Sequence, residues 1–254
     1  MRSVARISVS AVKGFRLQHP ERVELGPDGV PGNRRFFLVD ADGQRLRSSA
    51  TPWLAPLGAS YDARADRLTV RLPDGRELSG SAAPAGPRVH STAGSLEIRG
   101  SVVEGPWTAP LSELAGAPVR LARADPDAVT VQAPVTLVSD GSLARATAAA
   151  GLDRLDSRRF RMLFELAGCG AHEEDAWEGR LVRIGGAVVR VGEQVVRCAV
   201  TTRDPDTGAR DHDLLRVIAG YRGRREPDGA VLFGVYAHVE SPGPVRVGDP
   251  VELL

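Results

Sequence analysis

Short apolar runs separated by turn-forming residues make up the first hundred positions. The runs lie at 35–39, 67–72 and 96–99, and turn signals occur at 26–29, 40–43 and 72–75. An Asp-Gly turn between two such runs is the strongest short-range signal for a β-hairpin. The pattern therefore predicts an antiparallel, mainly β unit, interrupted by a loop over 80–87 (GSAAPAGP).

The remainder of the chain mixes strand and helix patterns. The runs 181–184 and 187–191 flank Ile-Gly-Gly and predict a further hairpin. Helical periodicity and capping residues predict three helices, over 108–115, 142–155 (capped by Ser139 or Ser142) and 211–221 (capped by Asp211). With a loop over 122–128, this mixture predicts a second lobe of α+β character.

Composition narrows the class of protein. A chain of 254 residues fits one large domain or two small ones, and 33 basic against 32 acidic residues argues against a nucleic-acid binder. No apolar run reaches the roughly 18 residues that span a bilayer, and the first residues lack a signal-peptide core. With only two cysteines, we expect a cytoplasmic protein without a disulfide framework.

The basic residues are almost all arginine, since Lys13 is the single lysine among the 33. Codon bias toward arginine accounts for the composition, and the surviving lysine can then be chance. Alternatively, position 13 needs a compact ammonium rather than a planar guanidinium.

The segment VVRCAVTTRDPDTG at 195–208 is the most distinctive in the chain. Arg197 favours the thiolate of Cys198, and a thiolate binds soft metals, but a free cysteine in a strand is equally a small buried apolar residue. The other cysteine, Cys169 in AGCG, is expected to be structural. The acidic turn 172–175 is expected to stabilise its lobe rather than bind metal, because adjacent side chains point in alternate directions.

RCAVTTRDPDTG at 197–208 resembles the metal-ligand motif of the MOSC superfamily, and in particular that of the amidoxime-reducing proteins. Five other segments resemble that family in the same order along the chain: SAVKGFRL (10–17), GNRRFFLVDADG (32–43), LVSDGSL (137–143), RRFRMLFELAGCGAHEEDAWEG (158–179) and LFGVYAHVESPGPVRVGDPVELL (232–254). The resemblance implies a mainly β or α+β chain of two β-rich lobes. The domains would be an N-terminal barrel-like unit (1–118) and a MOSC-type β-barrel with a few helices (119–254), with a cofactor cleft between them.

The resemblance also implies a site for the molybdenum cofactor in its molybdopterin form. Cys198 would be the protein ligand to molybdenum and the catalytic residue. Lys13, Arg34 and Arg161 would hold the pterin phosphate, with Gly14 beside them. Arg197 and Tyr236 would line the cleft. A phosphate monoester suits both an ammonium and forked guanidinium donors.

The chain departs from the family pattern at several of these places. Gly14 replaces a serine, Asn33 replaces an aspartate, and Leu163 replaces an asparagine. Residues 131–133 (Val-Gln-Ala) replace an acidic, hydroxylated stretch, and Ala11 replaces a proline. If Leu163 lies outside the core, Gly14→Ser with Leu163→Asn is expected to raise cofactor occupancy.

The function implied is reduction of N-hydroxylated or N-oxide groups of small molecules, with electrons from a separate donor protein and with no nucleic acid or membrane as a partner. Two alternatives remain. One is a metal-free enzyme of the same fold that acts on another small biosynthetic substrate. The other is a non-catalytic carrier of the cofactor or of sulfur, with a persulfide on Cys198.

Overall fold

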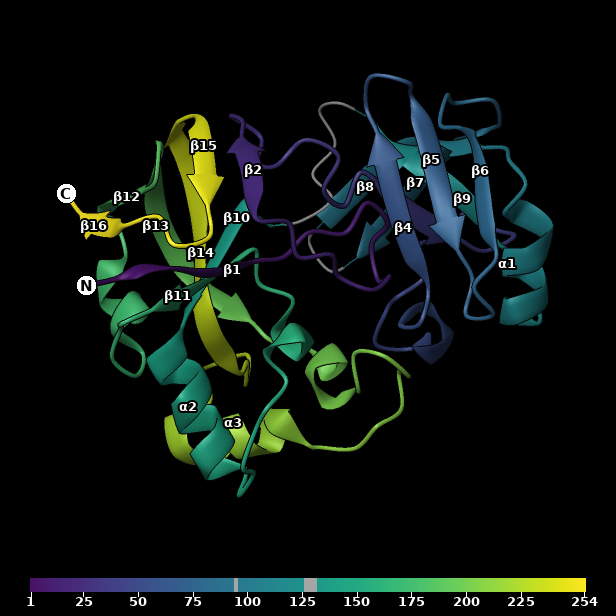
Figure 1. Ribbon diagram of the computed structural model, residues 1–254. Coiled ribbons are helices and arrows are strands. Elements are labelled where there is room, and N and C mark those ends of the chain that lie inside the picture. The colour runs from purple at the N-terminus through teal and green to yellow at the C-terminus, as the bar shows by residue number, and fades with distance from the viewer. Residues whose placement is uncertain (94–95, 126–131) are drawn as a thin grey trace.

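The strands gather into two lobes in a computed structural model that describes residues 1–93, 96–125 and 132–254 (Figure 1). One lobe contains a seven-stranded sheet and helices α2 and α3, and the other contains β3 to β9 and α1. The prediction of a mainly β chain with a barrel-like second lobe and few helices is confirmed.

The seven-stranded sheet forms the barrel-like lobe. Its strands, in spatial order, are β1 (Ser3–Ile7), β11 (Phe164–Ala167), β10 (Val135–Ser139), β14 (Leu232–Ser241), β13 (Ala187–Val196), β12 (Leu181–Ile184) and β16 (Val251–Leu253). The two edges meet, because the amide of Val4 donates to the carbonyl of Asp249 (2.9 Å) and the amide of Val251 donates to the carbonyl of Arg2 (3.0 Å). This contact nearly closes the sheet and covers its exposed edges.

Burial explains which runs became strands of this sheet. All five residues of β10 are buried, as expected for a strand covered on both faces. One face packs into the barrel core with Leu137 and Phe164, and the other meets α2 (Asp140–Ala149). β12 and β13 form the predicted hairpin, with Ile184 paired to Ala187.

Two smaller sheets build the other lobe. One has the order β3 (Phe36–Val39), β9 (Arg120–Ala124), β8 (Leu96–Val103), β7 (Arg88–Ala93), and the other has the order β4 (Gly58–Asp62), β5 (Arg67–Arg71), β6 (Glu77–Ser81). They enclose a core that contains Phe15, Phe36 and Trp107, all fully buried. The turn at 72–75 joins β5 to β6 as predicted, whereas the predicted loop over 80–87 begins two residues later, because β6 runs to Ser81.

The sheets do not divide at 118/119, the boundary expected from the sequence. β1 pairs with β11, and β2 (Arg22–Leu25) pairs with β15 (Gly243–Arg246), so the first strands lie with the C-terminal ones. β9 pairs with β3 and β8 in the other lobe. The predicted loop over 122–128 is wrong at 122–124, which end β9, while 126–128 lie outside the described residues.

The described residues contain three α-helices, as predicted, but not all of their ends agree with the prediction. α1 (Thr108–Ala115) has the predicted bounds. α2 is capped by Ser139, as one of the two predicted caps, but ends at Ala149 and not at 155. α3 (Leu214–Arg222) is capped by Asp213, so the prediction of Asp211 is wrong. Within the described ranges, no helix combines the length and apolarity needed to span a bilayer.

Candidate functional site

Cys198 lies at an exposed position where a barrel strand ends. β13 stops at Val196, and Cys198 then caps the short 3-10 helix η4 (Ala199–Thr202) in an extended conformation. Its thiol is exposed, whereas that of Cys169 is buried. Of the two interpretations of Cys198 that the sequence left open, the small buried apolar residue is therefore wrong.

Basic side chains from both lobes surround Cys198. Burial is the largest cause that lowers the pKa values of Lys13, Arg45, Arg161 and Arg197, and the charge of Cys198 opposes the lowering at each of them, so the four side chains lie near Cys198. Arg34 lowers the pKa values of Lys13, Arg161 and Arg197, so it belongs to the same group of charges. The structure thus brings together the side chains named from the sequence, while their roles stay predictions.

Burial and mutual repulsion lower the pKa values of this basic cluster. Burial lowers the pKa of Lys13 to about 7, and Arg45, Arg34 and Arg161 lower it further while Cys198 opposes them. Burial likewise lowers the pKa of Arg161 to about 9 and that of Arg197 to about 10. Cations held in this way favour an anionic ligand, which would stabilise the charged form of each.

Two of the arginines adopt a backbone conformation that is uncommon for residues other than glycine. φ is +54° at Arg34 and +53° at Arg161, which costs of order 1–3 kcal/mol each. Contacts across the lobes hold them there: Arg34 Nη2 donates to the carbonyl of Arg161 (2.6 Å), and Arg161 Nη2 donates to the carbonyl of Phe15 (2.7 Å). Such strain collects where a fold fixes a functional side chain.

Buried guanidinium donors without acceptors provide a test of fit for an anionic cofactor. The Nε atoms of Arg45 and Arg197 are buried and have no hydrogen-bond partner among the described residues. Arg197 otherwise donates to the carbonyl of Phe160 and lies over its ring, 5.4 Å from the centroid. Orphaned donors, surplus positive charge and an exposed thiol fit a group that combines a soft metal with a phosphate.

Tyr236, on β14, lies at the edge of the same cluster. Its hydroxyl donates to Gln132 Oε1 (2.9 Å). Burial raises its pKa, so the hydroxyl keeps its proton at neutral pH. Gln132 belongs to the stretch that departs from the family pattern, of which Val131 lies outside the described residues.

The departures at Gly14 and Leu163 have structural explanations. A Cβ at Gly14 would lie 2.7 Å from Ser48 Oγ and 2.9 Å from Leu54 Cδ1, and φ there is +95°. Leu163 is 2% exposed in the barrel core. An asparagine there would bury an amide among apolar side chains, so the condition for the Gly14→Ser and Leu163→Asn restoration is not met.

We expect Gly14→Ala to lower the free energy of unfolding by about 2–4 kcal/mol, because it adds a steric collision to the cost of the left-handed backbone. Gly43→Ala is the matched control, since φ is +78° there and a Cβ would meet nothing within 4 Å. It should cost only about 1–2 kcal/mol. Denaturant unfolding of both variants measures the difference, and equal losses would exclude the collision.

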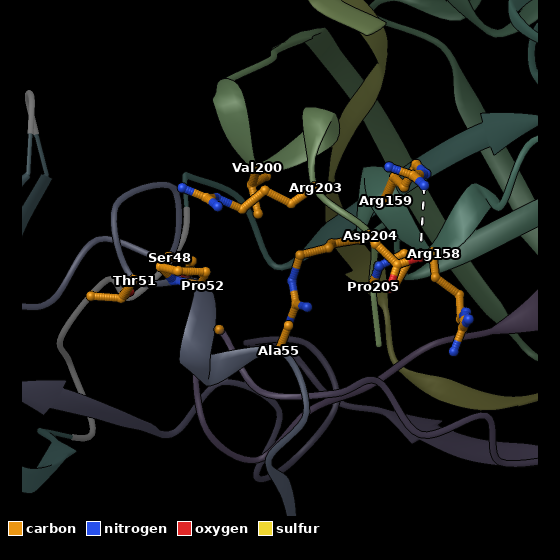
Figure 2. Close-up of a pocket in the computed structure, with 12 residues that line it drawn as sticks. Ser48, Thr51, Pro52, Ala55, Arg158, Arg159, Val200, Arg203, Asp204 and Pro205 are labelled. Carbon is orange, nitrogen blue, oxygen red and sulfur yellow. Dashed lines mark ion pairs between the residues drawn. The ribbon is translucent and has the colours of Figure 1, made fainter. Parts of the chain in front are cut away.

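A pocket lies beside the basic cluster, between the two lobes (Figure 2). Ser48, Thr51 and Pro52 come from one lobe, and Arg203, Asp204 and Pro205 come from the other. Further lining residues, including Arg161 of the basic cluster, are Gly14, Ala55, Arg158, Arg159, Arg161 and Val200. The pocket and the cluster are thus neighbours that share Arg161, although Cys198 does not line the pocket.

Ion pairs and hydrogen bonds to backbone carbonyls fix the arginines of the pocket wall. Arg158 pairs with Asp156 and Asp206, each at 2.6 Å. Arg203 joins the lobes, because its Nη2 donates to the carbonyl of Ser49 (2.7 Å). Arg159 is 5% exposed, donates from Nη1 to Asp211 (2.6 Å), and lies 3.8 Å from Asp204.

Asp211→Ala is expected to destabilise the protein by about 2 kcal/mol, because it leaves the buried Arg159 guanidinium without its main partner. Arg159 lowers the pKa of Asp211, so the contribution is present above the unfolded pKa of about 3.9 and is lost as pH falls through the lower folded value. Asp228→Ala, which breaks an exposed pair with Arg225, should have little effect. Thermal unfolding of both variants at pH 7 and pH 3 tests this, and an Asp211 effect unchanged at pH 3 would contradict it.

Cys169 and the acidic turn have structural roles. Cys169 packs in the barrel core, and burial is the main cause that raises its pKa to about 12. In η3 (Glu173–Trp177), the fully buried Glu174 accepts from the hydroxyl of Ser142 (2.7 Å), and Asp175 pairs with Arg222 (2.6 Å). Outside 94–95 and 126–131, no three His, Cys, Asp or Glu side chains group as metal ligands.

Arg45 and Ser48 are site residues that sequence reasoning missed. Both follow the turn after β3, and Arg45 forms a bridge to Val39. The only signal was the position after an Asp-Gly turn, which does not distinguish one arginine among so many.

The protein is thus a mainly β protein whose nearly closed barrel carries an exposed thiol beside a basic cluster. The model of the MOSC domain family matches residues 113–252, more than half of the chain. The chain belongs to the MOSC domain family.

Named relatives match part of the chain. The mouse protein "Mitochondrial amidoxime-reducing component 1" is 36% identical over 130 residues, which are 46% of this chain and 38% of that protein. The human component 1 is 33% identical over 48% of this chain and 37% of that protein. The human component 2 is 36% identical over 46% of this chain and 36% of that protein. The match therefore spans under two fifths of the length of these relatives. A crystal structure of the YUAD protein from Bacillus subtilis is similar at 13% identity, with a TM-score of 0.48 over 100% of this chain and 97% of that one.

Proposed function

We propose that the protein is a molybdenum-cofactor-dependent reductase of N-hydroxylated or N-oxide groups in small molecules. The observation that carries this proposal is the exposed thiol of Cys198 within a cluster of lysine and arginine side chains. The relatives named as amidoxime-reducing components support the substrate class, since an amidoxime carries an N-hydroxyl group.

The residues of the basic cluster fit the two ends of the cofactor. Cys198 would bind the metal as a thiolate, a ligand that soft metals prefer. Lys13, Arg34 and Arg161 would hold the phosphate of the pterin through charge-assisted hydrogen bonds. The protein would thus anchor and orient the cofactor, which when bound supplies the two-electron redox chemistry.

The side chains around Cys198 would also bind and orient the substrate. Arg197 lies beside Cys198 and would orient a substrate oxygen through its guanidinium, and Tyr236 holds a proton on its hydroxyl. Overall, an N-hydroxyl group takes up two electrons and two protons, the N–O bond breaks, and the amine or amidine leaves with one water. A separate donor protein would supply the electrons, because two cysteines cannot hold a four-thiolate iron–sulfur cluster.

A metal-free enzyme of the same fold is the second candidate. The arginine-lined pocket beside the basic cluster favours it, since that pocket can bind a small anionic substrate without a metal.

Elemental analysis tests the proposal. The chain is expressed with abundant molybdenum and cofactor, purified rapidly, and assayed for molybdenum per chain and for reduction of an aryl amidoxime with an artificial electron donor. We expect near-stoichiometric metal and measurable amine or amidine product. Metal-free protein after this expression would favour the second candidate, and metal without reduction would favour the carrier.

A further inference from the structure

The hydroxyl of Ser48 lies beside the glycine that replaces the family's serine. Ser48 belongs to the segment between β3 and the short helix η1 (Pro52–Leu54). A Cβ built on Gly14 would lie 2.7 Å from Ser48 Oγ and 3.5 Å from Ser48 Cβ. Since a serine hydroxyl stands one C–O bond from its Cβ, Ser48 Oγ lies close to where a hydroxyl at position 14 would be.

Neighbouring polar groups on this wall already have partners. Thr51 Oγ1 donates to the carbonyl of Arg47 (2.8 Å), and the carbonyl of Ser49 accepts from Arg203 (2.7 Å). The Ser48 side chain makes no hydrogen bond with any residue that the structure describes. It therefore presents a free hydroxyl to the pocket that it lines.

The opposite wall of the pocket is positively charged. Four arginines and one aspartate line it. The carboxylates that pair with Arg158 and Arg159 occupy those two side chains. Arg161 Nη2 donates to the carbonyl of Phe15, and within the described residues Arg161 has no carboxylate partner. Ser48 and Arg161 thus line the same pocket. Lys13 lies close by, because it precedes Gly14 in the chain and interacts with Arg161.

We infer that Ser48 binds the phosphate monoester of the ligand at this site and supplies the hydroxyl that Gly14 lacks. The serine of the family pattern is absent at position 14 because Ser48 and Leu54 occupy its space. The Ser48 hydroxyl, which comes from a different loop, would make a similar hydrogen bond to phosphate. Because Gly14 has no side chain, the segment of Ser48 can approach it closely. Identification of the phosphate as that of the pterin cofactor rests on the proposed function.

Binding of inorganic phosphate to the cofactor-free full chain is the first arm of the test. Phosphate should raise the melting temperature of the wild type, and the dissociation constant follows from the dependence on concentration. We expect Ser48→Ala to weaken phosphate binding about tenfold or more, since a hydrogen bond to a charged group is lost. Ser48→Thr, which keeps a hydroxyl, should bind within about threefold of the wild type.

Ser49→Ala is the matched control. It removes the adjacent hydroxyl but keeps the backbone carbonyl that accepts from Arg203. It should leave phosphate binding unchanged. Equal binding by Ser48→Ala and the wild type would overturn the inference, as would equal losses in the Ser48 and Ser49 variants or a wild type without phosphate binding.

Molybdenum content is the second arm and separates this inference from the proposed function. After expression with limiting cofactor, Ser48→Ala should retain less molybdenum per chain than Ser49→Ala. Phosphate binding that depends on Ser48 in a chain that never takes up molybdenum would support the anion site and overturn the proposed cofactor. Normal molybdenum uptake with no role for Ser48 in either arm would overturn this inference alone.

Discussion

Cys198→Ala is expected to purify with only trace molybdenum from cells in which the wild-type chain is loaded. In the proposed site the thiolate is the single protein ligand to the metal, so its removal leaves only the contacts to the pterin. The thiol is exposed, and its truncation should change the free energy of unfolding by no more than about 0.5 kcal/mol. Molybdenum per chain, with melting temperature as the check on folding, measures both expectations.

Cys169→Ala is the control for this experiment. Its thiol is buried in the barrel core and its pKa is raised to about 12, so it stays protonated at neutral pH. The variant should keep its molybdenum while losing about 1 kcal/mol of stability from the small cavity. A loss of metal from the Cys169 variant equal to that from Cys198→Ala would show that the assignment of a single thiol ligand is wrong.

Local sequence rules predicted those elements whose contacts are themselves local. The hairpin of 181–184 and 187–191 forms around its Gly-Gly turn, and 108–115 is a helix with the predicted ends. Both depend on turn chemistry or on i, i+4 contacts within a dozen residues. Ser139 caps α2 for the same reason, because the acceptor and the amide of Ser142 are three residues apart.

Long-range pairing could not be predicted in the same way. β1 and β2 read as part of an N-terminal β unit, yet they pair with β11 and β15, which lie far away in the sequence. The hydrophobic pattern of a strand does not specify which strand is its partner. Similarly, the sequence offers aspartate at both 211 and 213 before α3; Asp213 caps the helix, and Asp211 pairs with Arg159.

The candidate site also contains residues that the sequence could indicate and residues that only the folded chain reveals. The resemblance to the family pointed to Cys198 and Lys13, which also stand out because the chain has two cysteines and one lysine. Arg45 and Ser48 belong to common residue types, and only the folded chain brings them to Gly14 and Cys198. The replacement at position 14 removed a polar group from the pattern, while the structure places another hydroxyl beside it.

Binding of sulfate to the cofactor-free protein is expected to weaken as pH rises above about 7. Burial and the charges of Arg45, Arg34 and Arg161 lower the pKa of Lys13 to about 7, so its ammonium is present below that pH and lost above it. Sulfate favours the ammonium and raises the pKa of Lys13 in the complex. Between the two values the affinity should fall about tenfold for each pH unit. Sulfate suits this test because its own charge is constant over the range.

The lowered pKa of Lys13 also predicts that the stability of the free protein changes with pH in the direction opposite to sulfate affinity. The folded pKa of about 7 lies below the ordinary value of 10.5, so the unfolded chain binds more protons between these pH values. The free energy of unfolding should therefore rise with pH from about 7 upward when no anion is present. Saturating sulfate should reduce this rise, because it stabilises the charged form of Lys13 in the folded protein.

Two variants at position 13 separate the ammonium from the rest of the cluster. Lys13→Met removes the charge and should bind sulfate weakly, with little dependence on pH between 6 and about 8, because the lowered pKa of Arg161 is still about 9. Lys13→Arg keeps a guanidinium that stays charged over this range, so its binding should also be flat but stronger than that of Lys13→Met. Thermal shifts with sulfate at four or five pH values measure all three chains. A wild-type profile as flat as that of Lys13→Met would mean that Lys13 does not titrate at the anion site, and the assignment of its ammonium to the phosphate would then be wrong.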